Sequence, residues 1–523
     1  MHNLLTDPLI RFNRSAHGRI EASLPEVYAA LMRDDVEAFP ALRPHQRHAW
    51  HAFLAQLGAI AIHRANLSEP PQVAEEWCRI IRGLTPDYTD DEPWQLVVDD
   101  ITKPAFMQPH ARSKDREQDY KSTVATPDEL DMLITSKNHD LKSAVAARAN
   151  FDDWIFALIT LQTMEGFSGA GNYGISRMNG GLGSRPAFSL APFVGGPGAH
   201  VRRDIIALLE YLPTLLSEYP MTDGGEALLW TVPWDGTQAE ALLLNQLDPL
   251  YIEVCRRIRL RFKADGPLNG VRTSSRAARI EGKELKGRTG DPWTPANTSR
   301  EGLPLTLASG GFTYKRVKEY LIDWERPPLL RPTRSEQDSS APMRLVARGM
   351  VRGQGKTEGY HERSIAVRHQ LKMAMLSSGG TQDLGSIAET RIEEVGTVQR
   401  ILSHAIQVFA ARGDSDKVSP EGRTLARPWL NRLDGLVDAR FFEDLQDEFE
   451  APNSEREGVH NRWLMHVVDH ARGLLHDAAD SLPCPAIHRY KAEVNAVGLF
   501  EGRLRGGSGL PFLFDQQEKE VEI

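Results

Sequence analysis

The chain has 523 residues, which is more than one hydrophobic core supports, so we expect two or more domains. Its 41% hydrophobic and 25% charged residues are typical of a soluble globular protein, and its longest nearly apolar run, residues 53–62, is too short to cross a bilayer. The formal net charge of −9 argues at first sight against a nucleic-acid partner.

Three widely separated cysteines, Cys78, Cys255 and Cys484, provide neither a disulfide framework nor a C-x-x-C metal motif. The first residues contain no basic segment followed by an apolar stretch, so we expect no secretory signal. These observations favour a protein of the reducing cytoplasm that has no membrane partner.

Residues 1–380 combine short strand-like runs, helices and long loops. A stripe with helical spacing consists of Phe151, Trp154, Ile155, Leu158, Ile159 and Leu161. Alternating runs at residues 259–263 and 312–317 predict short strands. Stretches rich in proline and glycine, such as residues 288–304, predict long loops.

A glycine-rich stretch, GFSGAGNYGISRMNGGLGSRP, follows that helical stripe at residues 166–186. It contains a formal G-x-G-x-x-G match, but a dinucleotide site needs a strand before the glycines and a helix after them. Here a helix precedes the glycines, and three further glycines and a proline prevent a clean helix start afterwards. A Walker A loop is also excluded, because no G-K-[ST] follows.

The remaining interpretation is a long loop whose bare main chain can approach a ligand closely. Arg177, Arg185, Asn172 and Asn179 lie among the glycines as possible partners for phosphates or base edges. The alternative is an ordinary surface loop whose glycines only satisfy positive φ angles.

Four amphipathic stripes follow residue 380, at residues 392–409, 433–449, 459–474 and 486–500. They predict a helical bundle. The fold class is therefore predicted as α+β, with a large mixed N-terminal domain with long loops (1–380) and a C-terminal four-helix bundle (381–523).

Basic residues concentrate in two segments despite the negative net charge. Residues 256–288 carry eleven Lys or Arg against three acids, and residues 344–372 carry seven against Glu358 and Glu362. Two such local excesses in an acidic protein favour a polyanion site.

The sequence contains no HExxH, GxSxG, P-loop or paired-aspartate nuclease pattern, so we expect no catalytic residues and no enzyme activity. His466 and His470, with His460 and His476 nearby, have spacing that suits a metal. However, His470 lies on or beside a core-facing helical stripe and no third ligand is evident. We therefore expect neither a bound metal nor a cofactor.

Several short motifs occur in an order that resembles one protein family. They are NLLTDPLIRF (3–12), PAFMQ (104–108), TPDELDMLITSKNHDLKS (126–143), the glycine stretch, YIEVC (251–255), GDPWTPANTS (290–299), RGMVRGQGK (348–356) and the terminal helical region. This order resembles the CasA family, the large subunit of the type I-E CRISPR surveillance complex Cascade.

The resemblance implies a non-catalytic subunit that reads the protospacer-adjacent motif in duplex DNA and starts strand separation, while base pairing with a guide RNA reads the sequence. Its DNA contacts would be a glycine loop, a lysine finger in the minor groove and a wedge. By position these are Gly166, Gly169, Ala170, Gly171 and Asn172 for the loop, Lys283 or Lys286 for the finger, and Arg352, Gly353, Gln354 and Gly355 for the wedge.

The resemblance also implies the partners: guide crRNA, double-stranded target DNA, the backbone and small Cascade subunits, and a helicase-nuclease. The guide would contact Lys137, Asn138, His139 and Lys142, although the family's loop has an aromatic residue where this one is polar and charged. The family's cysteine zinc knuckle is missing here, so no zinc is expected.

Two alternatives remain open from the sequence. The chain could be the large subunit of another type I CRISPR subtype, in which different residues would read the motif. It could also be a metal-dependent nucleic-acid enzyme that uses His139, Asp140 and a bound cation.

Overall fold

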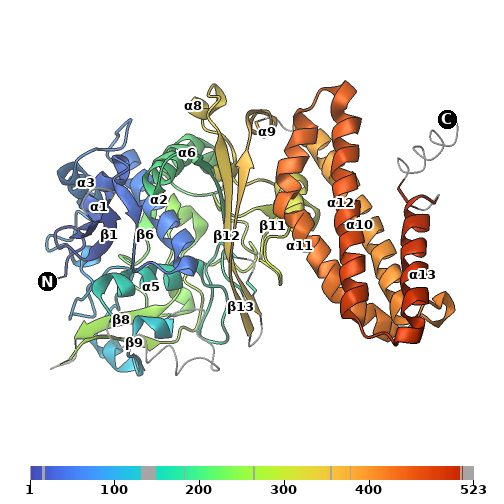
Figure 1. Ribbon diagram of the computed structural model, residues 1–523. Coiled ribbons are helices and arrows are strands. Elements are labelled where there is room, and N and C mark those ends of the chain that lie inside the picture. The colour runs from blue at the N-terminus through green and yellow to red at the C-terminus, as the bar shows by residue number, and fades with distance from the viewer. Residues whose placement is uncertain are drawn as a thin grey trace. The chain divides into compact units, whose positions relative to one another are not determined.

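The computed structural model describes residues 2–14, 18–130, 149–178, 180–181, 183–262, 266–353, 356–376, 379–506 and 509–510. The chain forms two compact units (Figure 1). Unit 1 comprises Met1–Phe312 and Asp323–Lys372, and unit 2 comprises Thr313–Ile322 and Met373–Ile523. The predicted α+β class is confirmed, whereas the division at residue 380 stays a prediction.

Unit 1 mixes helices with several small sheets. Its helices are α1 (Leu24–Met32), α2 (Arg47–Arg64), α3 (Ala74–Arg82), α5 (Phe151–Met164), α6 (Pro197–Glu218) and α8 (Arg334–Gln337), with α9 (His369–Ala374) at its end. The central helix α2 contains the run 53–62 and is buried along most of its surface, as expected for a helix that is apolar on all sides. Among the described residues, no helix is long and apolar enough to span a membrane.

The strands of unit 1 pair in small groups. The sheets are β2 (Gly18–Ala22)–β1 (Ile10–Arg14)–β3 (Val36–Ala38), β4 (Ser122–Val124)–β9 (Leu268–Thr273)–β8 (Arg257–Phe262), β6 (Glu226–Leu228)–β7 (Leu247–Ile252), β10 (Ala296–Asn297)–β11 (Leu303–Pro304), and β13 (Lys356–Val367)–β12 (Met343–Gly353)–β5 (Ala187–Pro192). Strand β8 confirms the strand predicted at residues 259–263.

Strands β12 and β13 form a long antiparallel hairpin, which Figure 1 shows clearly. Their register runs from Met343 opposite Val367 to Gly353 opposite Lys356, with a shift between Val351 and Arg352. The paired strands of the hairpin therefore extend as far as Arg352 and Gly353, the first two residues of the predicted wedge.

Two buried glutamines tie helix α5 and the loops of unit 1 to strand β8. Gln108, from the PAFMQ motif, accepts the Leu260 N–H at 2.6 Å and donates to two carbonyls. The Gln162 carbonyl accepts the N–H groups of Cys255 (2.9 Å) and Arg256 (2.8 Å). Buried amide groups need such partners. Gln108 thus fixes strand β8, and Gln162 fixes the segment Cys255–Arg256, which contacts the glycine stretch.

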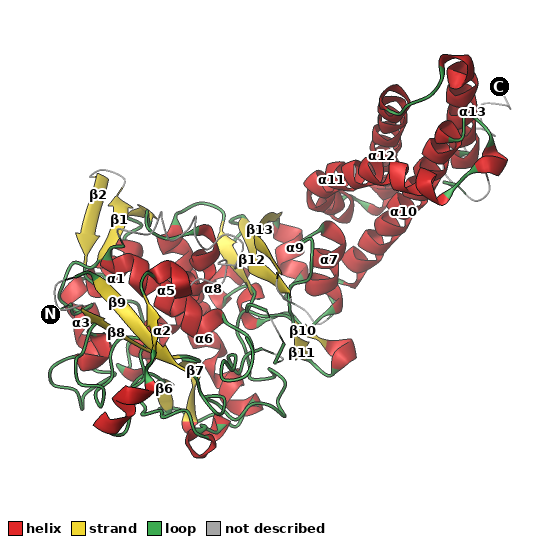
Figure 2. Ribbon diagram, turned by 90° about the horizontal axis from the view of Figure 1, so that it is seen from below, coloured by secondary structure: helices red, strands yellow, loops and turns green. Residues whose placement is uncertain are grey.

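Unit 2 is helical (Figure 2). Helices α10 (Gln382–Ala410), α11 (Pro420–Glu450), α12 (Asn453–Ser481) and α13 (Ala486–Leu504) form the predicted bundle. Each buries an apolar stripe, as the periodicity of the sequence indicated.

The strand predicted at residues 312–317 is wrong, because the segment forms helix α7 (Tyr314–Lys318). Tyr314 and Val317 are buried, and α7 packs on α10 and α11. The carboxylate of Asp438 accepts the Tyr314 N–H at 2.5 Å, at the end of the helix where N–H groups have no partner within the helix. These contacts outweigh the strand propensity of the isolated segment.

A charged network lies between helices of the bundle. Glu448 pairs with Arg391 at 2.7 Å and with His460 at 3.1 Å, while His460 also contacts Glu394 at 3.0 Å. The Arg391 guanidinium lies 4.2 Å from the centre of the Trp463 ring. Burial lowers the pKa of His460, but its hydrogen bonds to the two carboxylates outweigh burial and raise the pKa to about 9.

We predict that unit 2 loses stability between pH 6.5 and 9, because the bound proton of His460 stabilises the folded state only below its folded pKa. The loss is at most about 3 kcal/mol. Thermal unfolding followed by circular dichroism checks this across that range. His460→Gln should make the stability less dependent on pH. His476→Gln, at an exposed position on the same helix, should leave the pH dependence unchanged. Equal pH dependence for wild type and His460→Gln would contradict the prediction.

Candidate nucleic-acid interface

The glycine stretch begins with a tight turn at its exposed tip. Ser168 donates its N–H to the Asn172 carbonyl at 2.9 Å, and Asn172 donates to the Gly169 carbonyl at 3.0 Å. Gly169 and Gly171 have φ angles of +108° and +84°, which other residues rarely adopt. Ala170 and Asn172 are exposed, so this turn presents main chain to solvent with little side-chain cover.

The glycines of this stretch differ in how much space surrounds them. A Cβ at Gly166 would lie 2.6 Å from the Gly181 carbonyl oxygen, and one at Gly174 would lie 2.5 Å from the Phe167 nitrogen. These two positions must be glycine because the stretch folds back on itself. By contrast, a Cβ at Gly169 meets nothing within 4 Å, so space there is available to a ligand.

The buried carboxylate of Glu165 joins the glycine loop to the predicted wedge. It pairs with Arg256 at 2.8 Å and with Arg352, near the end of β12, at 3.4 Å. Arg352 also donates to the Ser168 hydroxyl at 3.2 Å, and Arg256 donates to the Gly166 carbonyl at 3.1 Å. One acidic side chain thus orients two cations that come from distant parts of the sequence.

A third segment, the residues that follow β9, lies against the same loop. Ser275 donates its N–H to the Gly171 carbonyl at 2.9 Å, and the Tyr173 hydroxyl donates to the Arg276 carbonyl at 3.0 Å. A Cβ at Gly171 would lie 2.7 Å from the Cβ of Ser274. The exposed Arg276 therefore lies beside the glycine loop; the basic composition of its segment signalled it, but the motif comparison did not single it out.

The two candidate finger lysines continue this segment. A Cβ at Gly282 would be in ordinary contact, 3.4 Å, with the Cβ of Ser176, so the turn carrying the lysines lies near the base of the glycine loop. Lys283 and Lys286 are both exposed. Lys286 has a left-handed backbone (φ +50°), and its ammonium group lies 3.9 Å from the exposed carboxylate of Glu301. Such an exposed pair is weak and leaves the lysine available to another anion.

Two residues of the YIEVC motif form hydrogen bonds with Ser176 of the glycine loop. Glu253 accepts the Ser176 N–H at 2.8 Å and its hydroxyl at 2.9 Å, and that hydroxyl lies 2.8 Å from the Tyr251 hydroxyl. Burial raises the pKa of Glu253 to about 7. This carboxyl group holds the chain rather than a ligand, because its partners are loop atoms.

The prediction that Arg177 and Arg185 contact phosphates is wrong. Arg185 is buried and pairs with Asp291, its Nε donating to one carboxylate oxygen at 2.6 Å. Arg177 is buried with its guanidinium 4.1 Å from the centre of the Tyr251 ring. Both guanidinium groups are thus buried inside unit 1 rather than exposed to a ligand. Asn179 lies outside the described residues.

The basic segment 256–288 also divides into two parts. Arg259 and Arg279 are buried and donate to main-chain carbonyls, and Arg257 is buried beside the ring of Tyr120. The exposed part consists of Arg272, Arg276, Lys283, Lys286 and Arg288. Among the described residues of this segment, Arg276 lies beside the glycine loop, and Lys283 and Lys286 lie on the turn near its base.

Some predicted contacts cannot be placed. Gln354 and Gly355 of the wedge lie outside the described residues, as do the guide contacts Lys137, Asn138, His139 and Lys142, and Asp140. Of the wedge, Arg352 is placed beside Glu165, and Gly353 pairs with Lys356 across the hairpin.

Comparison with known proteins identifies the family. The model of the CRISPR-associated protein Cse1 family matches residues 3–474, which is most of the chain. The chain belongs to the Cse1 family. The resemblance seen in the sequence, to the large subunit of type I-E Cascade, is therefore confirmed. No curated protein matches the chain.

Solved structures of the Cse1 family share the fold over almost the whole chain. Cse1 from Acidimicrobium ferrooxidans matches with a TM-score of 0.62 at 14% identity, covering 96% of this chain and 97% of that chain. CasA (Cse1) from Thermus thermophilus gives 0.59 at 14% identity, covering 95% and 98%. A chain of a CRISPR RNA-guided surveillance complex gives 0.56 at 14% identity, covering 95% and 99%.

We predict that Gly174→Ala destabilises unit 1 by about 2 kcal/mol or more, because the added methyl group overlaps the main chain of the loop. Gly169→Ala, where space is open, should cost only the roughly 1 kcal/mol of an unfavourable φ angle. Thermal unfolding of the two variants distinguishes them. A larger loss for Gly169→Ala would show that the tip, and not the base, holds the loop.

Proposed function

We propose that this chain is the non-catalytic DNA-recognition subunit of an RNA-guided CRISPR surveillance complex. The observation that supports this most is the contact of three elements within unit 1: the glycine turn, the end of the β12–β13 hairpin and the segment 274–286. These elements correspond to the family's loop, wedge and finger. Sequence similarity alone does not require them to be neighbours.

The glycine turn and the lysine would read the protospacer-adjacent motif. An exposed main chain around Gly169 and Gly171 can approach a duplex closely, and its N–H and C=O groups serve as contacts. A lysine, Lys286 or Lys283, would enter the minor groove, where A·T and G·C pairs are distinguished but finer differences are not. Such a reader tolerates several related motifs.

The hairpin would separate the strands next to that motif. The wedge consists of Arg352, Gly353, Gln354 and Gly355, and its paired strands give it the stiffness that prying apart base pairs needs. Arg352 is held by Glu165 and Ser168, so the wedge is aligned on the turn that binds the duplex. Gln354 would supply polar contacts to the opened bases without any catalytic proton transfer.

The remaining contacts follow from the family. Lys137, Asn138, His139 and Lys142 would contact the guide crRNA, and unit 2 would contact the small subunits, the displaced strand and the helicase-nuclease that cuts the target. The exposed basic residues make DNA binding sensitive to salt. We propose a cytoplasmic complex in which this subunit licenses cleavage by another protein.

Co-purification tests this function directly. Tagged full-length chain, expressed with its neighbouring genes, should be recovered with a short RNA and several smaller proteins, and the complex should bind duplex DNA that carries an adjacent motif. Recovery without RNA would contradict the proposal, and DNA cleavage by the chain alone in magnesium would favour an enzyme.

We predict that Gln354→Ala slows strand opening about tenfold in the assembled complex, while duplex encounter changes little. The reason is that the wedge acts after the duplex is bound. Fluorescent base analogues next to the motif report opening, and anisotropy reports encounter. Gln118→Ala, an exposed glutamine of unit 1, is the matched control; equal losses in opening and encounter would contradict the wedge assignment.

We predict that Lys286→Ala lowers motif-dependent affinity about tenfold by removing a minor-groove cation. Competition between duplexes with and without the motif measures this effect. Lys121→Ala, an exposed lysine outside the basic segment, should have little effect. If Lys283→Ala gives the loss instead, the finger lies one turn earlier in the chain.

A further inference from the structure

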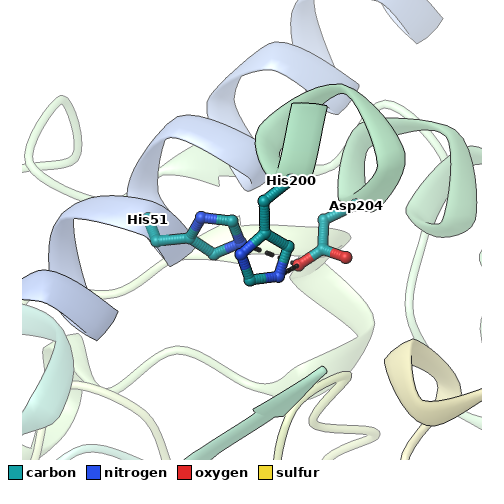
Figure 3. A group of neighbouring side chains, drawn as sticks. All are labelled: His51, His200 and Asp204. Atoms are coloured by element: carbon teal, nitrogen blue, oxygen red, sulfur yellow. Dashed lines mark hydrogen bonds and ion pairs between the residues drawn. The ribbon is translucent and has the colours of Figure 1, made fainter. Parts of the chain in front are cut away.

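Two histidines and an aspartate meet where helices α2 and α6 pack together (Figure 3). His51 comes from α2, and His200 and Asp204 lie one helical turn apart on α6. The helices approach closely because α2 has Gly58 at the crossing, where a Cβ would lie 2.8 Å from the Ile205 side chain. The side chains of His51, His200 and Asp204 are 12%, 7% and 0% exposed.

The candidate ligand atoms of the three groups lie within 4.8 Å of one another. Nε2 of His51 lies 2.8 Å, and Nε2 of His200 lies 3.5 Å, from the same oxygen, Oδ2 of Asp204. The second distance is long for an N–H···O bond. Two atoms bound to one tetrahedral zinc, at bonds of 2.0–2.1 Å, lie about 3.3 Å apart.

The neighbouring Arg203 orients the carboxylate of Asp204. Arg203 donates to Oδ1 of Asp204 at 3.0 Å, which orients the carboxylate and leaves Oδ2 facing the two rings. Arg203 itself also pairs with Glu336 at 3.2 Å, so it does not leave an unbalanced positive charge there.

A hydrolytic triad does not fit the same residues. The Ser189 hydroxyl lies 2.7 Å from Nε2 of His200, the same ring nitrogen that faces Asp204. A serine–histidine–aspartate triad needs the hydroxyl on one ring nitrogen and the carboxylate on the other. The geometry therefore excludes proton relay from Ser189 through His200 to Asp204.

We propose that His51, His200 and Asp204 bind one divalent transition-metal ion, with Zn²⁺ as the best match to two imidazoles and one carboxylate. Water or the Ser189 hydroxyl would complete the tetrahedron. The ion would join α2 to α6 inside unit 1. Nearby Arg344 and Arg348 weaken the affinity of the site for a cation without occupying it.

Metal content tests the proposal. Untagged full-length protein is stripped with a chelator, equilibrated with Zn²⁺, passed through a desalting column and analysed by mass spectrometry. One zinc per chain is expected, with a rise of a few degrees in the melting temperature. The matched control is His63→Gln. His63 lies on the same helix as His51 and pairs with Asp223 at 2.8 Å, but among the described residues these two have no third side chain with which to bind a metal.

The decisive comparison is His51→Gln, which alters the more exposed ligand and should abolish zinc retention while circular dichroism shows an intact fold. Asp204→Asn is the second variant, should His51→Gln fail to fold. Co²⁺ in place of Zn²⁺ should give the intense visible bands of a tetrahedral site in wild type and His63→Gln only. Equal zinc retention by wild type and His51→Gln, or no retention by wild type, would overturn the proposal.

Discussion

The buried carboxylate of Glu165 is the contact on which the arrangement of the candidate interface depends. It lies where helix α5 ends and the glycine loop begins, and it pairs with Arg256 from the start of β8 and with Arg352 from the end of β12. A buried charge that loses its partner costs about 3–5 kcal/mol, so each of the three residues constrains the other two. The loop, the sheet and the hairpin are thereby held in one geometry.

Polar side chains near this ion pair act together with the apolar cluster of Ile175, Met178 and Cys255 to position the loop. Gln162 binds the main chain at Cys255 and Arg256, and Glu253 binds both polar groups of Ser176. Directional contacts of this kind specify a single backbone path, which a purely hydrophobic contact does not. A glycine-rich segment has few side chains that pack, so polar contacts with its neighbours contribute much of its order.

The helices were largely predictable from the sequence, since an amphipathic stripe shows which face is buried. The bundle and helix α5 confirm this.

The strand prediction for residues 312–317 failed because helix α7 is stabilised by Asp438 and by two neighbouring helices, which no local pattern reveals. The positive charge of the basic segment was overestimated as a surface feature for a related reason. Arg259 and Arg279 bind buried carbonyls, whereas a count of charges treats every arginine as exposed. Likewise, His51 of the α2–α6 cluster lies more than a hundred positions before His200 and Asp204, so the three residues form no sequence motif.

The register shift between Val351 and Arg352 limits how this hairpin can diverge among relatives. Side chains alternate between the two faces of a strand, so losing or gaining a single residue in β12 before that point would rotate Arg352 to the opposite face. The guanidinium group would then leave Glu165, while the rest of the strand could still pair with β13. A change of length in β12 before Arg352 would therefore separate the hairpin from the glycine loop without unpairing its strands.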